Sequence, residues 1–159
     1  MNLQKKILSA VDEAILLGYF KSFCEKNDDV SSKQRLRNII SRAKNGSGAI
    51  KALFLNEMQV ELSDEQSLII YELIVAYLKK SNYRKNVSND VKRRLLVKQS
   101  NKCKFCGCEI DLSAHADHVV PFKYVGDELS DNFQMLCSHC NEVKNASIDY
   151  EIKVLLHIS

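Results

Sequence analysis

The chain has 159 residues, which is the length of one ordinary domain or two small ones. Apolar residues make up 45% and charged residues 27%, which excludes a disordered or fibrous chain, and a net charge of +3 argues only weakly for a nucleic-acid partner. No apolar run approaches the roughly 18 residues that cross a bilayer. Asp12 and Glu13 interrupt the apolar stretch behind Lys5 and Lys6, so this stretch is not a secretion signal and we expect a soluble, cytoplasmic protein.

Residues 1–82 have the pattern of a helical domain. Helices are predicted, in chain order, for residues 3–23, 33–44, 49–57 and 64–80. Ser31 and Ser32 are expected to cap the second helix, and Ser63 opens a capping box at the start of the fourth. Residues 68–78 are apolar nearly all round, so we expect the fourth helix to be buried in its own bundle or else to dock a partner.

The composition changes in residues 83–159, which we assign to a second domain. Between positions 84 and 104, eight basic residues stand against Asp90 alone: Arg84, Lys85, Lys92, Arg93, Arg94, Lys98, Lys102 and Lys104. Ser88 is expected to cap a short helix that ends near residue 98. A basic run is often only a solvated helix face. Here it adjoins the closely spaced Cys103 and Cys106, a spacing typical of a metal-binding motif, which favours phosphate contact, with Arg93 and Arg94 as candidates.

The remainder of the chain alternates short β-prone pieces with turns. Strands are predicted for residues 109–112 and 116–120 and a helix for 138–145, whereas the apolar end, 148–159, is ambiguous between strand and helix. The fold class expected from this order is α+β, with a helical N-terminal domain followed by a small metal-stapled domain.

Two Cys-x-x-Cys motifs mark the metal-binding part of the second domain. Cys103 and Cys106 form the first motif, Cys137 and Cys140 form the second, and 30 residues separate them. The two-residue gap lets paired thiolates converge on one ion, and four thiolates form the closed tetrahedral site that is typical of structural zinc. A redox-active pair or a chance spacing is the alternative. The neighbouring Cys108 is expected to be an ordinary small residue.

The residues between and behind these motifs follow a further pattern. In chain order it consists of Asp117 and His118, Pro121, Asn132 and, directly after the last cysteine, Asn141. In this order the residues resemble the HNH nuclease family. Its ββα-metal core carries an Asp-His pair followed by a proline, and then an asparagine before a Cys-x-x-Cys motif that is preceded by leucine. The resemblance covers about residues 88–147, and it implies an HNH fold for this part of the chain.

The resemblance also implies a role for each residue. His118 would be the general base, and Asp117 and Asn141 would hold the catalytic Mg²⁺ or Mn²⁺. Asn132 would fix the loop between the strands and orient His118, and Lys144 would reach a phosphate. The chemistry agrees, because neutral imidazole suits a base near neutral pH and oxygen ligands suit hard cations. Neighbours on a regular strand point to opposite faces, so Asp117 and His118 can share one phosphate only where the strand twists, bulges or ends.

Alternatives stay open for several of these residues. His115, two residues before Asp117, either assists the metal or phosphate from the same strand face or is structural. His139 either contacts the substrate or has no such role. Asp117 either holds the metal or is a hydrogen-bonding turn residue. Asn141 either holds the metal or caps the helix that follows the second Cys-x-x-Cys motif.

The sequence therefore predicts a metal-dependent HNH endonuclease that hydrolyses DNA phosphodiester bonds, with zinc in the scaffold and Mg²⁺ or Mn²⁺ in the active site. Residues 1–82 would serve recognition, dimerisation or partner docking, so a homodimer or a partner protein is expected and a membrane is not. One rival is a zinc-ribbon module that binds nucleic acid or protein without cutting. Another is the nuclease subunit of a larger complex, such as a phage-defence system or a packaging machine. RNA is less favoured than DNA as the substrate.

Overall fold

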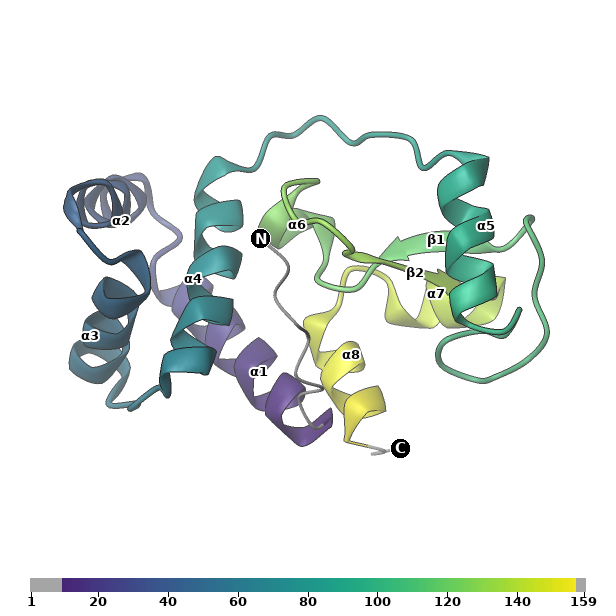
Figure 1. Ribbon diagram of the computed structural model, residues 1–159, viewed down its shortest axis with the longest axis horizontal. Helices are drawn as coiled ribbons and strands as arrows, with labels where there is room; N and C mark the ends of the chain where they lie inside the picture. Colours follow the sequence, from purple (N-terminus) through teal and green to yellow (C-terminus); the bar gives the residue numbers. More distant parts are fainter. Residues whose placement is uncertain (1–9, 157–159) are drawn as a thin grey trace.

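A computed structural model describes residues 10–156 as an α+β protein, as the sequence predicts (Figure 1). Its elements in chain order are α1 (Ala10–Lys26), α2 (Val30–Arg42), α3 (Gly46–Met58), α4 (Asp64–Lys79), α5 (Asn89–Lys98), β1 (His115–His118), α6 (Phe122–Val125), β2 (Phe133–Leu136), α7 (Ser138–Lys144) and α8 (Ile148–Leu155). The part of the first predicted helix that covers residues 3–9 lies outside the described residues. Within residues 10–156, no helix is both long enough and apolar enough to cross a membrane.

Side-chain caps determine where the helices α2 and α4 begin. The Ser63 side chain accepts a hydrogen bond from the Gln66 amide (3.1 Å), and the Gln66 side chain accepts one from the Ser63 amide (2.9 Å). The predicted capping box of α4 is thus confirmed. The prediction that Ser31 and Ser32 cap α2 is wrong. Asp29 caps this helix, because its carboxylate accepts the Ser32 amide at 2.8 Å and suits the positive end of the helix dipole.

One large apolar core holds α1 to α4 together. Its fully buried members from this region include Phe20, Phe23, Leu36, Ile50, Phe54, Leu62, Ile70 and Ile74. Phe23 of α1 and Phe54 of α3 stack with ring centroids 4.9 Å apart. Tyr77 of α4 meets Phe20 of α1 edge to face at 6.4 Å. Large rings therefore join three of the four helices.

The helix α4 is buried on one face rather than all round. Ile70, Ile74 and Tyr77 lie inside the core, whereas Leu68 is 40% exposed and Glu72 also faces solvent. The helix contacts α1, α3 and α6, so most of its apolar excess is used within this chain. This agrees with the expected burial in its own bundle, apart from the exposed face.

The second predicted domain, residues 83–159, is built on an antiparallel pair of short strands. β1 pairs with β2 in a register that sets His118 opposite Phe133. α5 packs against β2, and α7 follows β2 directly in the chain. Residues 109–112 do not form the predicted strand. A single bridge between Lys102 and Glu109 takes its place, because no further strand pairs with this segment.

Two helices from the later part of the chain pack back on the helical region. The ambiguous segment 148–159 contains a helix, α8, which lies against α1, and α6 packs against α4 (Figure 1). Val120, Val125 and Ile148 accordingly belong to the same core as the side chains of α1 to α4. The connector between α4 and α5 runs over the top of the molecule in Figure 1. The two predicted domains are therefore joined by apolar packing as well as by the chain.

Candidate active site

Four thiols from two sequence-distant motifs gather beside the end of β2. The Sγ atoms of Cys103, Cys106, Cys137 and Cys140 lie within 4.8 Å of one another. Those of Cys106 and Cys137 are 3.8 Å apart. A tetrahedral ion with Zn–S distances of about 2.3 Å needs neighbouring sulfurs about 3.8 Å apart, so the cluster fits zinc. Gly107, whose φ of 73° lies in the left-handed region, lets the chain turn directly behind the first motif.

The surroundings of the thiols favour the thiolate form at two of the four positions. Hydrogen bonds from the backbone and side chain of Cys108 lower the pKa of Cys106 to about 6. The Cys140 amide, in the first turn of α7, lowers the pKa of Cys137. Burial instead raises the pKa of the Cys140 thiol. A bound cation would displace the remaining protons, because the thiolate is the form that binds metal.

Three residues with predicted catalytic roles line one cleft of about 450 Å³. Asp117 and His118 reach it from the end of β1, and Asn141 reaches it from α7. β1 ends at His118, which removes the difficulty that neighbours on a regular strand point to opposite faces. The end of the strand therefore lets adjacent side chains line the same cavity.

The His118 ring is held from several sides and is only 4% exposed. Its Nε2 atom lies 2.7 Å from Oδ1 of Asp127, and its Nδ1 atom lies 3.4 Å from the guanidinium group of Arg84. Phe133 and Phe122 pack against the ring, with centroid distances of 4.5 and 5.5 Å. Protein contacts therefore determine the orientation of this imidazole.

Asp117 belongs to a buried polar network. Its Oδ2 atom pairs with Nζ of Lys144 at 2.7 Å, and Lys144, itself 1% exposed, also donates to the His118 carbonyl oxygen at 2.8 Å. Gln134 of β2 donates to both Asp117 (3.3 Å) and Glu151 of α8 (3.2 Å). Burial raises the pKa of Glu151 to about 7. The ammonium group of Lys144, for which the sequence predicts a phosphate contact, is thus already paired with Asp117.

Asn132, the residue directly before β2, is hydrogen-bonded to the loop behind β1. Its side-chain oxygen accepts a hydrogen bond from the Val120 amide (2.8 Å), and its side-chain nitrogen donates to the Val120 carbonyl oxygen (2.9 Å). Its own backbone carbonyl oxygen accepts the Val119 amide at 2.9 Å. These contacts are those of a residue that fixes the loop. Its predicted effect on His118, the residue before Val119, stays a prediction.

Four other candidates do not line the cleft. His115 is exposed, and its Nε2 atom lies 3.2 Å from the Ser138 hydroxyl at the start of α7. His139 is exposed on the same helix, and Arg93 and Arg94 are exposed on α5. The structure therefore does not bring these four residues together with Asp117, His118 and Asn141.

Two residues in contact with His118 are absent from the predicted set. Arg84 lies in the connector between α4 and α5 and appears in the sequence only as a member of the basic run. Asp127 lies in the loop behind α6 and belongs to no motif. Burial by itself would raise the pKa of Asp127, but hydrogen bonds from the Lys85 amide (2.7 Å) and from His118 outweigh it and hold this pKa below its usual value.

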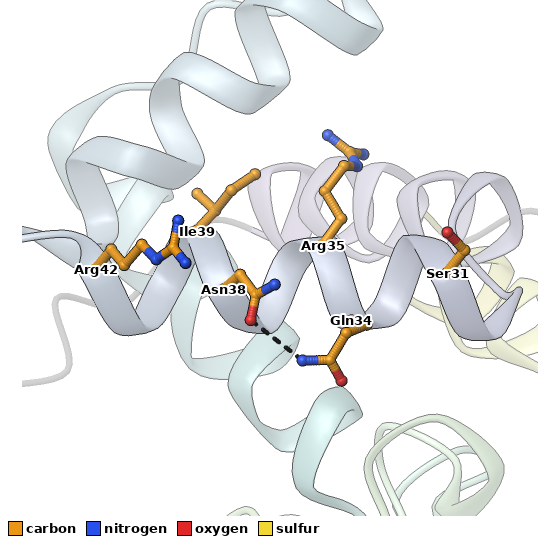
Figure 2. A pocket seen from close by; sticks show the side chains of 6 residues that line it. All are labelled: Ser31, Gln34, Arg35, Asn38, Ile39 and Arg42. Carbon is orange, nitrogen blue, oxygen red and sulfur yellow. Dashed lines mark hydrogen bonds between the residues drawn. The ribbon is translucent and has the colours of Figure 1, made fainter.

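A second hollow, of about 460 Å³, lies on the surface of α2 (Figure 2). It is lined by Ser31, Gln34, Arg35, Asn38, Ile39 and Arg42. Gln34 donates to Asn38 along the helix at 3.1 Å, and Arg35 pairs with Glu57 of α3 at 2.7 Å. Its lining residues include no histidine, cysteine or carboxylate, so the candidate chemistry lies in the other cleft.

The fold and the cleft together define a class of domain, in which two antiparallel strands and a helix are pinned by four cysteines and an Asp-His pair ends the first strand. Residues 103–147 match the family model described as HNH endonuclease. The predicted resemblance is thereby confirmed for this segment, which is an HNH domain and supports a nuclease-type function. No curated protein and no solved structure matches the chain.

Proposed function

We propose that the protein is a metal-dependent endonuclease that hydrolyses DNA phosphodiester bonds. The observation that carries this proposal is the common cleft of Asp117, His118 and Asn141, which joins one imidazole and two oxygen donors within an HNH domain. A zinc-ribbon module that only binds nucleic acid would need the four cysteines, but it would have no use for this combination of side chains.

The oxygen donors of the cleft fit a hard divalent cation. Asp117 would offer Oδ1, since its Oδ2 pairs with Lys144 at 2.7 Å, and Asn141 would offer its amide oxygen. So small a set of protein ligands suits Mg²⁺ or Mn²⁺, because these ions keep several waters and take further ligands from phosphate. Such a cation would supply positive charge for the phosphate and for the leaving oxygen.

The cysteine cluster would hold zinc as a structural ion, because four thiolates leave no coordination position open for chemistry. This ion would join the first cysteine motif to the start of α7, the helix that carries Asn141 and Lys144. A reducing, cytoplasmic setting would keep the thiols available for the metal.

His118 would take a proton from the attacking water, because imidazole ionises near neutral pH. Lys144, through its contacts with Asp117 and with the His118 carbonyl oxygen, would position both residues at the end of β1. Arg84 would add a permanent positive charge beside the imidazole, where a phosphate would lie. By analogy with the family, cleavage would leave 5′-phosphate and 3′-hydroxyl ends.

DNA is the proposed partner because Arg84 belongs to the basic segment that continues with the exposed Arg93 and Arg94 of α5. One cleft of this kind would cut one strand. Cleavage of both strands would need two copies of the chain or two events, which is the ground for proposing a homodimer or a partner protein.

Cleavage of supercoiled plasmid DNA in the presence of Mg²⁺ or Mn²⁺ tests the proposal. We expect His118→Ala to lower the cleavage rate by about 10²- to 10⁴-fold, the usual contribution of a general base. His139→Ala is the matched control, because it removes an exposed imidazole outside the cleft and should cut at the wild-type rate.

Equal cutting by wild type and His118→Ala would remove His118 from its role. A wild-type protein that binds DNA in a gel-shift assay but does not cut it, with either cation, would favour the zinc-ribbon reading. Persistent cutting after the cations are removed with EDTA would contradict the proposed metal dependence.

A further inference from the structure

The contact between His118 and Asp127 is the shortest polar contact made by the imidazole. Nε2 of His118 lies 2.7 Å from Oδ1 of Asp127, and the two side chains are 5% and 8% exposed. A contact of this length between largely buried groups is a hydrogen bond little weakened by solvent. The resemblance to the HNH family assigns no role to position 127, which lies nine residues beyond His118.

Asp127 is itself held by the connector between α4 and α5. The Lys85 amide donates to the second carboxylate oxygen, Oδ2, at 2.7 Å. The preceding residue, Gly126, has a φ of 57°, and a Cβ atom added there would lie 3.0 Å from Cβ of Lys80. The positive φ and the close approach to the connector both favour glycine at this position. The carboxylate therefore meets the imidazole in one fixed orientation.

Donor and acceptor chemistry then selects one tautomer of His118. An ionised carboxylate only accepts hydrogen bonds, so the proton shared with Asp127 belongs to Nε2 of the imidazole. A guanidinium group only donates, so Nδ1, which lies 3.4 Å from Arg84, carries no proton. Asp127 thus requires a proton on Nε2, and Arg84 requires a lone pair on Nδ1. Only the neutral Nε2–H form meets both requirements together.

We propose that Asp127 is a positioning residue that fixes His118 as the Nε2–H tautomer and thereby makes Nδ1 the atom that accepts the proton of water. The inference rests on the proposed function, because it names the basic atom of that reaction. Water would take the place of the 3.4 Å contact between Arg84 and Nδ1. When this water gives its proton to Nδ1, its O–H bond breaks and an N–H bond forms. As the resulting hydroxide attacks phosphorus, the bond from phosphorus to the 3′ oxygen breaks, and that oxygen takes a proton from solvent to become the 3′-hydroxyl. The positive charge that appears on the imidazole then faces the Asp127 carboxylate.

This assignment also gives the connector a part in the reaction. Arg84 and Lys85 are neighbours in the connector and contact the two members of the Asp127–His118 pair. The backbone of the segment that joins the helical region to α5 therefore supports the carboxylate that holds the base. We expect Asp127 to act on the turnover number, because its side chain reaches DNA only through His118.

The test compares Asp127→Asn with Glu128→Gln in the full-length, zinc-loaded protein. Both variants remove one carboxylate charge from the same loop, but Glu128 is exposed and Asp127 is not. An amide offers one acceptor oxygen, so it cannot serve the Lys85 amide and the His118 Nε2–H together. The ¹⁵N resonances of the imidazole, assigned among the four histidines by comparison with His118→Ala, report the tautomer directly.

We expect the wild type and Glu128→Gln to show a protonated Nε2, and Asp127→Asn to show loss of that single form. In plasmid cleavage we expect kcat of Asp127→Asn to fall by about 10²- to 10⁴-fold, the cost of a misplaced imidazole proton, with KM unchanged. A wild-type imidazole protonated on Nδ1 would overturn the assignment, even should Asp127→Asn fail to fold. So would an Asp127→Asn variant that keeps both the tautomer and kcat.

The two proposals fail separately. A protein that never cuts DNA, but whose His118 carries its proton on Nε2 in a manner that depends on Asp127, would lose the proposed function and keep the positioning role. A protein that cuts DNA with equal rates in wild type and Asp127→Asn would keep the function and lose the positioning role.

Discussion

The helical region from α1 to α4 and the HNH domain are stabilised in different ways. The helical region buries large apolar side chains in one continuous core, in which Phe23 and Phe54 stack. Apart from Val120 and Val125, which join that core, the buried apolar residues of the HNH side form two small clusters. One lies around Leu96 and Met135, and in the other Leu136 packs against the cysteines. A segment with so little apolar burial of its own gains most from an additional cross-link, and an ion held by the four thiolates would supply one.

Buried polar groups are also divided unequally between the two regions. Beside the cleft they comprise His118, Asn132, Gln134, Lys144 and Glu151, whereas α1 to α4 and their loops contribute Asn27 and Ser67. Burying polar groups lowers stability unless each is paired, and perturbed ionisable groups gather at functional sites. The comparison teaches that apolar packing stabilises one region, while the other combines a cysteine cluster suited to a metal ion with a polar site that is costly to bury.

The largest expected effect is the loss of the metal cross-link. Cys140→Ser should lose the zinc and the fixed structure of residues 103–147, because structural zinc contributes on the order of 10 kcal/mol to folding. Most amide signals of α1 to α4 should stay dispersed, since their core does not include the four thiols and takes only Val120 and Val125 among its buried members from residues 103–147. Elemental analysis and amide NMR measure both outcomes. Cys108→Ser is the control and should keep its zinc, and zinc retained at full stoichiometry by Cys140→Ser would refute the cross-link.

A cavity in the helical core should have the opposite signature. Phe54→Ala should lower the free energy of unfolding by about 3 to 5 kcal/mol, because it removes a fully buried ring that stacks on Phe23. Zinc content should not change. Urea denaturation gives the free energy, with Leu55→Ala, at a position 51% exposed, as a control that should stay within about 0.5 kcal/mol of wild type. A comparable loss in both variants would contradict the assigned core.

The buried ion pair offers a way to sharpen the comparison. Lys144→Met should lower the free energy of unfolding by about 3 kcal/mol, because it leaves the largely buried Asp117 carboxylate without its cation. Adding Asp117→Asn should recover part of this loss, since the unpaired charge is then gone. Lys153→Met, on the exposed side of α8, controls for loss of a lysine. Additive losses in the double variant would show that the two side chains are not coupled.

The smallest expected effect is a pH dependence due to Glu151. Its pKa in the folded protein is raised from 4.5 to about 7 by burial, so the folded state binds the proton more tightly than the unfolded chain does. The stability that this carboxyl contributes is therefore present at low pH and is lost as pH rises toward 7. Between pH 5.5 and 8 the loss should be roughly 2 kcal/mol, at about 1.4 kcal/mol for each pKa unit.

Glu151→Gln isolates this contribution. The difference between the unfolding free energies of wild type and variant should change by that amount across the interval. Relative to wild type, the variant should gain stability as the pH rises from 5.5 to 8. A difference that stays constant with pH would show that Glu151 is ionised throughout this range.

Short-range features of the sequence proved sufficient for each Cys-x-x-Cys motif of the cysteine cluster and for the capping box of α4. In each Cys-x-x-Cys motif and in the capping box, two residues separate the interacting pair. Such short spacings depend little on the rest of the fold. Local sequence preference predicted the wrong structure at two places. Residues 109–112 are β-prone but meet no further strand, and Asp29 outcompetes Ser31 and Ser32 as a cap because it directly precedes the helix.

The amino-acid sequence by itself determined that the chain carries four thiols and an Asp-His pair in the order of an HNH domain, because that order is written within a few dozen residues. Only the tertiary structure decided what surrounds the imidazole. Arg84 lies 34 residues from His118 in the chain, and Glu151 reaches the site through Gln134. Such contacts depend on how the connector crosses the molecule and how α8 packs against α1, and no local spacing encodes the packing of distant helices.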